Sequence, residues 1–128
     1  MLENANVVPM LPVNDLPTAQ RFYEETLGLK KLRGEPEVFI TYQSGDSTLN
    51  IYRSEFAGTN KGTAALWEVD DVEGTVKQLK AKGVTFEHYD DMPGVTRDGD
   101  LHRAGPLTVA WLKDPAGNIL SVQNRPAA

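Results

Sequence analysis

The sequence predicts an α+β fold in which two βαβββ modules form a half-barrel cleft. The first observation behind this prediction is an internal repeat, since residues 13–16 (VNDL) correspond to residues 69–72 (VDDV) and Gly28 corresponds to Gly83. The second is that a strand pattern precedes each tetrapeptide and a helical pattern follows it. The third is that several strand patterns, separated by turn residues, follow each helix. Two small sheets with a helix on one face each would leave their other faces to enclose a ligand.

The first module begins with a strand over residues 7–13 and a helix over residues 16–27. Pro9 and Pro12 cannot donate to a strand ladder, so this strand is expected at a sheet edge. The helix is predicted because apolar side chains recur at helical spacing. These side chains are Leu16, Ala19, Phe22, Tyr23 and Leu27.

Three further strands complete the first module. They are expected over residues 29–33, 38–43 and 48–53, and Gly34-Glu35-Pro36 separates the first two. The turn cluster at 44–47 would join the last two strands as a hairpin. Residues 54–62 then form a glycine-containing connection to the second module.

The second module repeats this order with a longer polar segment before its last hairpin. Its helix is predicted over residues 71–82, and residues 90–105 are interpreted as a polar, glycine-punctuated loop. Its strands are predicted over residues 63–69, 84–89, 107–113 and 119–123.

Each predicted helix has its own start signal. Asn14 and Asp15 are the candidates for the N-cap of the first helix, because their short side chains can accept from the free N–H groups of the first turn. Asp70 followed by Glu73 resembles a capping box at the start of the second helix. Gly28 and Gly83 are expected to end the two helices.

The composition is that of one ordinary globular domain over residues 1–128, with repeats over about 5–55 and 62–124. Of its 128 residues 40% are hydrophobic and 24% are charged. No apolar run is long enough for a membrane span, and 13 basic against 18 acidic residues include no basic stripe for nucleic acid. The absence of cysteine excludes disulfides and thiolate chemistry and favours a cytoplasmic protein. The expected partner is therefore a small molecule, not a nucleic acid or a membrane.

Three groups of motifs stand in a fixed order inside the repeat. They are VNDL at 13–16 leading to Phe22-Tyr23 and LGL at 27–29, WEVDDV at 67–72, and KDPAGN at 113–118 before the last apolar strand. In this order they resemble the vicinal oxygen chelate (VOC) superfamily of glyoxalase I, extradiol dioxygenases and bleomycin-resistance proteins. The resemblance covers about residues 7–123 and implies the glyoxalase/bleomycin-resistance fold for this single VOC domain.

The resemblance also raises the question of a metal. Enzymes of this superfamily hold a divalent metal inside the half-barrel, on His, Gln or Glu side chains of the first and last strands of each module. Carried onto this sequence, the four ligand positions fall on Val8, Asn50, Ala64 and Ser121. Valine and alanine offer no donor atom, and neutral serine and asparagine are poor replacements for the hydration of a dication. We therefore expect no metal and no other cofactor, and the resemblance is closest to the metal-free bleomycin-resistance branch.

Strand periodicity selects the side chains that would face the cleft. If the ligand positions of the family face it, every second residue of the same strands does so too. On this basis the predicted ligand contacts are Met10, Asn50, Tyr52, Ser121 and Gln123. Trp111 is added as a contact, although the hairpin register that would direct its ring is not fixed by the sequence. The alternate residues, expected to pack under the helices, are Leu11, Val13, Leu49, Ile51, Ala65, Trp67, Leu120 and Val122.

More than one class of function stays open from the sequence. The first is metal-independent binding of a small aromatic or cationic molecule, because tryptophan offers a π face and an acidic chain attracts cations. The second is a lyase or isomerase of the glyoxalase type with non-standard ligands or a loop acid/base, for which His102 is the catalytic candidate. A third is a subunit or regulatory module whose cleft is vestigial. A homodimer is expected, because open sheet edges are usually covered by a partner. The alternative is a pseudo-dimer closed within one chain, in which the prolines protect the edge strand.

Overall fold

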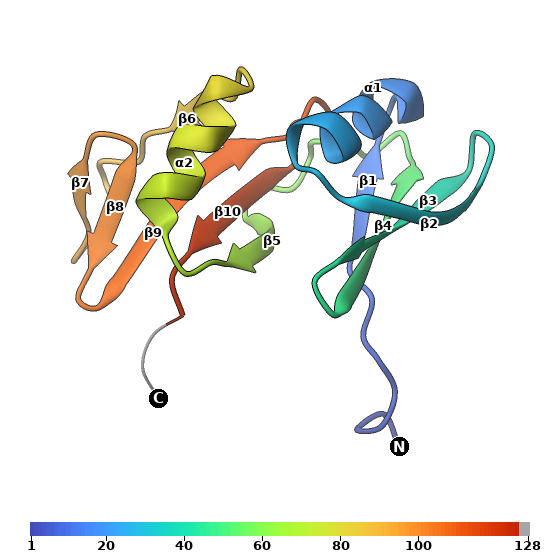
Figure 1. Ribbon diagram of the computed structural model, residues 1–128, viewed down its shortest axis with the longest axis horizontal. Coiled ribbons are helices and arrows are strands. Elements are labelled where there is room, and N and C mark those ends of the chain that lie inside the picture. The colour runs from blue at the N-terminus through green and yellow to red at the C-terminus, as the bar shows by residue number, and fades with distance from the viewer. Residues whose placement is uncertain (126–128) are drawn as a thin grey trace. The chain divides into compact units, whose positions relative to one another are not determined.

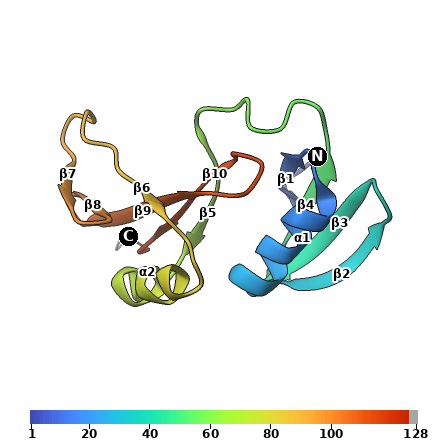
Figure 2. The same cartoon turned by 90° about the horizontal axis from the view of Figure 1, so that it is seen from above.

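The computed structural model describes residues 1–125, and the chain divides into two compact units. Unit 1 comprises residues 1–59 with 115–118, and unit 2 comprises, among the described residues, 60–114 with 119–125. Each unit contains one sheet with a helix packed on one face (Figures 1 and 2). The prediction of an α+β fold is confirmed.

Unit 1 contains a four-stranded sheet in the order β1-β4-β3-β2. Its strands are β1 (Met10–Val13), β2 (Lys30–Glu35), β3 (Phe39–Ser44) and β4 (Ser47–Arg53). β1 runs parallel to β4 at one edge of the sheet, as the prolines predicted, and begins only after Pro9. The antiparallel β3–β4 hairpin is also confirmed.

The predicted first helix forms in two parts. α1 (Leu16–Arg21) is α-helical, and η1 (Phe22–Thr26) continues it as a π-helix in which the Leu27 N–H donates to the Phe22 carbonyl at 2.9 Å. Asp15 is the N-cap, and its carboxylate accepts from the Thr18 N–H at 3.2 Å. The two parts together agree with the helix predicted over residues 16–27. The π-helical turn, which is wider than an α-helical turn, was not predicted.

The core of unit 1 lies between this helix and the sheet. Tyr23 is completely buried and stacks on Tyr42, with ring centroids 6.0 Å apart. The Tyr42 hydroxyl donates to Glu24 at 2.9 Å, and burial together with this carboxylate raises the pKa of Tyr42. Four side chains predicted to pack here are buried, and they are Leu11, Val13, Leu49 and Ile51.

Unit 2 contains a sheet with the order β5-β10-β9-β8-β7, and β6 pairs with β9 as well. Its strands are β5 (Thr63–Glu68), β6 (Phe86–Glu87), β7 (Thr96–Asp98), β8 (Leu101–Ala104), β9 (Leu107–Lys113) and β10 (Ile119–Gln123). α2 (Val72–Ala81) packs on β9 and β10. Leu120 and Val122 are buried as predicted, whereas Ala65 and Trp67 are only half-buried.

Two predictions for unit 2 need correction. The strand expected over 84–89 shrinks to the two residues of β6, and the loop expected over 90–105 contains the β7–β8 hairpin. The tight turn of this hairpin is Gly99-Asp100, where glycine adopts a φ of 63°. Gly99, which the sequence pattern assigned to a loop, is therefore a hairpin turn residue. A loop glycine and a turn glycine can be told apart only when the pairing of the flanking strands is known.

The start of α2 also differs from the prediction. Asp71, not Asp70, is the N-cap, and its carboxylate accepts from the Gly74 N–H at 3.0 Å. Glu73 instead forms an ion pair one turn along the helix, with its Oε1 3.8 Å from Lys77 Nζ. The capping box was wrong because the helix begins one residue later than expected. Neither helix within residues 1–125 has the length and hydropathy of a membrane span.

The Asp-Pro-Ala-Gly-Asn turn belongs partly to unit 1, although β9 and β10 on either side belong to unit 2. Asn118 is buried, and its Nδ2 donates to the Pro12 carbonyl at 2.7 Å. Gly58 packs so closely on this turn that a Cβ there would collide with the Ala116 carbonyl oxygen. The turn therefore acts as a structural element of unit 1 as well as a hairpin loop.

Candidate functional site

In unit 1, the structure brings two predicted ligand contacts together. Met10 and Thr41 lie on either side of Asn50 in the ladder. Thr41 Oγ1 donates to Asn50 Oδ1 at 2.6 Å, and Asn50 Nδ2 donates to Met10 Sδ at 3.3 Å. Tyr52 lies two residues along β4, on the same side as Asn50. The sequence reasoning missed Thr41, because its place opposite Asn50 depends on the hairpin register.

A cavity of unit 1 lies elsewhere. It has a volume of about 790 Å³ and adjoins the start of α1 and the β2–β3 turn. None of the predicted ligand contacts lines it. Its charged and polar lining residues include Asp15, Gln20, Lys31, Glu35, Glu37 and Arg53.

In unit 2, the remaining predicted contacts lie on one face of the sheet. Ser121 is paired with Trp111, while Gln123 is paired with Val109 two residues away. His102 on β8 is also paired with Val109, and so it shares this face. The β9–β10 register thus aims Trp111 at the face opposite α2, which the sequence alone left undecided.

Trp111 is the centre of a small aromatic cluster. Its ring lies edge-on to His102 at 4.8 Å and to Tyr89 at 5.3 Å between centroids. Its Nε1 donates to Thr63 Oγ1 at 3.0 Å. Tyr89 was not predicted. It lies two residues after Glu87, which pairs with Trp111, and this pairing is visible only in the structure.

A pocket of about 420 Å³ adjoins this cluster in unit 2. Its apolar lining consists of Tyr89, Trp111, Met92 and Ile119. Its polar lining residues are Lys61, Thr63, His88, Asp90 and Asp91. This volume is in the usual range for small-molecule sites. Of the predicted ligand contacts only Trp111 lines it, and Ser121, 2% exposed, lies beneath the surface.

The two carboxylates of the pocket differ in their surroundings. Asp90 Oδ1 lies 2.7 Å from Arg97 Nε, and this hydrogen bond lowers the pKa of Asp90. Among the described residues, Asp91 has no ion-pair partner. Asp91 is therefore the carboxylate that can neutralise a bound cation.

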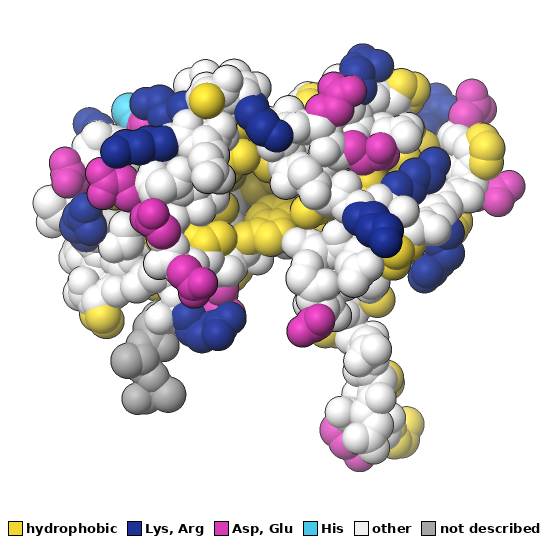
Figure 3. Space-filling model, viewed as in Figure 1, with side chains coloured by type: hydrophobic (Ala, Val, Ile, Leu, Met, Phe, Trp, Pro, Cys, Tyr) yellow, Lys and Arg dark blue, Asp and Glu magenta, His cyan; other side chains and the backbone are white. Residues whose placement is uncertain are grey.

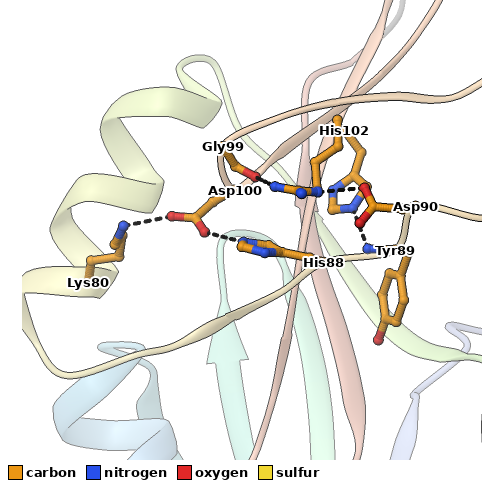
Figure 4. A network of polar contacts seen from close by, with 8 residues as sticks. Lys80, His88, Tyr89, Asp90, Gly99, Asp100 and His102 are labelled. Carbon is orange, nitrogen blue, oxygen red and sulfur yellow. Dashed lines mark hydrogen bonds and ion pairs between the residues drawn. The ribbon is translucent and has the colours of Figure 1, made fainter.

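Next to the pocket, a polar network ties the β7–β8 turn to α2 (Figure 4). Asp100 accepts from Lys80 Nζ at 2.7 Å, and its other oxygen lies 2.8 Å from His88 Nε2. These two contacts hold the pKa of Asp100 below its usual range. The network ties His88, the first residue of the pocket-lining segment 88–92, to the β7–β8 hairpin.

His102 is hydrogen-bonded to the same pocket-lining segment, residues 88–92. Its side chain is only 1% exposed, and its Nε2 accepts from the Tyr89 backbone N–H at 2.9 Å. Burial lowers the pKa of His102, with His88 and Arg97 acting in the same direction. With its accepting nitrogen occupied and its ring buried, His102 is poorly placed to exchange a proton with a substrate from solvent.

The residues predicted to stand at the metal positions of the family do not fit a divalent cation. Val8 precedes β1, and Ala64 falls where the β5–β10 register shifts. The Asn50 carbonyl oxygen already accepts from Thr41, and Ser121 is buried. Within residues 1–125, no group of three or more His, Cys, Asp or Glu side chains could hold a metal.

Positive and negative side chains are interspersed on the face drawn in Figure 3, where the coloured residues form no continuous basic patch. Nucleic-acid binding normally requires such a patch.

Comparison with known proteins points to one family. The sequence model of the Glyoxalase/Bleomycin resistance protein/Dioxygenase superfamily matches residues 7–122. The lactoylglutathione lyase of Haemophilus influenzae is 31% identical to this chain, over 91% of this chain and 90% of the relative. The chain thus spans nearly the whole length of this relative.

Solved structures of proteins with related names share the fold of this chain. The bleomycin-binding protein of Streptomyces verticillus, solved with copper(II)-bleomycin, is 27% identical, with a TM-score of 0.69 over 98% of this chain and 99% of that chain. Lactoylglutathione lyase from Agrobacterium tumefaciens shares the fold at 20% identity, with a TM-score of 0.70 over 94% of this chain and 93% of that one. Enzymes and binding proteins thus occur among the similar structures.

Proposed function

We propose, since the chain belongs to the glyoxalase/bleomycin resistance protein/dioxygenase superfamily, that it binds a small aromatic cation without a metal. The observation that carries this proposal is the pocket of unit 2, where Trp111 and Tyr89 offer ring surfaces and Asp91 offers an unpaired carboxylate. Aromatic rings attract cations through their π faces, and a carboxylate adds charge complementarity. The lack of donors at Val8 and Ala64 supports binding without a metal.

The enzyme alternative is favoured by the lactoylglutathione lyase of H. influenzae, which is 31% identical. It would need non-standard metal ligands or His102 as an acid or base. The burial of His102 and its bond to Tyr89 favour the binding function instead. Turnover of the glutathione–methylglyoxal adduct, with stoichiometric metal kept through dialysis, would establish the alternative.

Trp111→Ala is expected to weaken binding of 9-aminoacridine, a planar fluorescent cation, by about fivefold or more. Loss of a stacking ring costs on the order of 1 kcal/mol, which corresponds to about that factor. Fluorescence titration at pH 7.5 measures the effect. Trp67→Ala is the matched control, because Trp67 is also in unit 2 but does not line the pocket.

Acridine, which is neutral at this pH, tests the contribution of charge. We expect it to bind more weakly than 9-aminoacridine, and Asp91→Asn to remove that difference. Equal affinities of wild type and Trp111→Ala for 9-aminoacridine would contradict the proposed pocket. Equal affinities of the two acridines for the wild type would show that charge does not contribute to binding and would contradict the preference for a cation.

We also propose that the chain forms a homodimer. β2 is an edge strand exposed along its whole length, and such edges are usually covered by a partner. Light scattering at micromolar concentration should give about twice the 14.1 kDa mass of one chain. A particle of one chain mass at that concentration would contradict the dimer.

A further inference from the structure

The direction of one hydrogen bond determines the protonation state of His102. The Tyr89 backbone N–H can only donate, so His102 Nε2, 2.9 Å away, must carry no proton. The proton of the neutral ring is therefore on Nδ1, a buried atom without a hydrogen-bond partner among the described residues. This bond joins β8 to the segment 88–92, all five residues of which line the pocket.

A proton on Nε2 is incompatible with this arrangement. It would place two donors against each other and leave a cation in a ring that is 1% exposed. Around the ring, Arg97 and His88 oppose protonation, while Asp90 favours it but is paired with Arg97 at 2.7 Å. The Val109 backbone also favours the charged form, although it does not reach hydrogen-bond geometry with Nδ1.

We propose that neutral His102 is the positioning residue that holds Tyr89 in the pocket wall, and that its protonation releases segment 88–92 and opens the pocket. The consequence for binding rests on the proposed function, but the release itself does not. Burial holds the pKa of His102 below its ordinary value of 6.5, so the release belongs to mildly acidic pH. The unfolded chain takes up this proton first as the pH falls, so folding stability decreases below about pH 6.5 as well.

The release can be followed without a ligand, through Trp111. In a Trp67→Phe protein, Trp111 is the only tryptophan, and its ring lies 4.8 Å from the imidazole of His102. We expect its emission to change in one step with a midpoint below pH 6.5. Binding of 9-aminoacridine, which stays cationic over this range, should fall about tenfold between pH 7.5 and 5, in line with the loss of one partly buried hydrogen bond and its pocket wall.

Two variants separate His102 from other titrating groups. His102→Gln supplies an amide oxygen that can accept from Tyr89 but does not titrate, so the emission step should disappear and binding at pH 5 should recover. His88→Gln removes the only other histidine, and the Trp111 step should persist in it. A step that survives in His102→Gln, or vanishes in His88→Gln, would overturn the positioning role.

An NMR titration of the two imidazoles in the Trp67→Phe protein decides the question even if His102→Gln does not fold. The midpoint of His102 must coincide with that of the emission step, and a separate midpoint would overturn the proposal. An emission step that follows His102 without any 9-aminoacridine binding would support the positioning role and contradict the proposed ligand. Binding that titrates while Trp111 emission stays constant would contradict the positioning role alone.

Discussion

Tyr23→Ala is expected to lower the free energy of unfolding by about 3–5 kcal/mol, the range for truncating a large buried aromatic side chain. Tyr23 is 0% exposed, and its ring fills the space between the first helix and the sheet against Tyr42. Its removal would leave a cavity that the stiff strands below cannot close. Urea unfolding followed by circular dichroism measures the change, because both tryptophans lie in unit 2 and do not report on unit 1.

The matched control is Phe56→Ala, another aromatic truncation in unit 1. Phe56 is 65% exposed, so its removal should change the unfolding free energy by less than about 1 kcal/mol. Similar losses in the two variants would contradict the core described for unit 1. Tyr23→Phe should keep most of the packing, since it retains the ring.

Asn118→Ala is expected to cost about 1–3 kcal/mol of unfolding free energy. Its Nδ2 donates to the Pro12 carbonyl at 2.7 Å, and the removal of a buried donor leaves its partner unsatisfied. The cost should appear in unit 1, because residues 115–118 pack there. Circular dichroism in urea again provides the measurement.

Asn118→Asp tests the donor itself, since it keeps the size of the side chain and turns an acceptor toward the Pro12 carbonyl. We expect it to be at least as destabilising as alanine. Asn60→Ala serves as the control on an exposed asparagine whose bonds are local, to Gly62. Stability of Asn118→Asp equal to that of the wild type would show that the Pro12 contact contributes nothing.

The sequence by itself determined the order of the elements, apart from the β7–β8 hairpin, and the buried face of three strands. Alternation predicted the buried face of β1, β4 and β10, and Leu11 and Ile51 are examples of residues found as predicted. The β9–β10 hairpin formed at its predicted bounds, 107–113 and 119–123. These features depend on spacing over a few residues, which is visible along the chain.

The tertiary structure decided which of these residues meet. The ring of Tyr89 lies against those of Trp111 and His102, although Tyr89 follows β6, Trp111 is on β9 and His102 is on β8. No local motif marks Tyr89. The β7–β8 hairpin looked like a loop because its strands are three and four residues long and gain their stability from pairing with each other and with β9. Ser121 and Gln123 lie on the predicted face but not in the pocket lining, and their contact with a ligand stays a prediction.

The physical reason for this division is the range of the interactions. Helix periodicity, strand alternation and turn preferences act between residues that are close in sequence, so the chain alone reveals them. The register of paired strands, and the burial of a polar group such as His102, depend on residues far away in sequence that become neighbours only on folding. Local spacing therefore identified β9 and β10, while strand pairing placed Trp111 next to His102 and Tyr89.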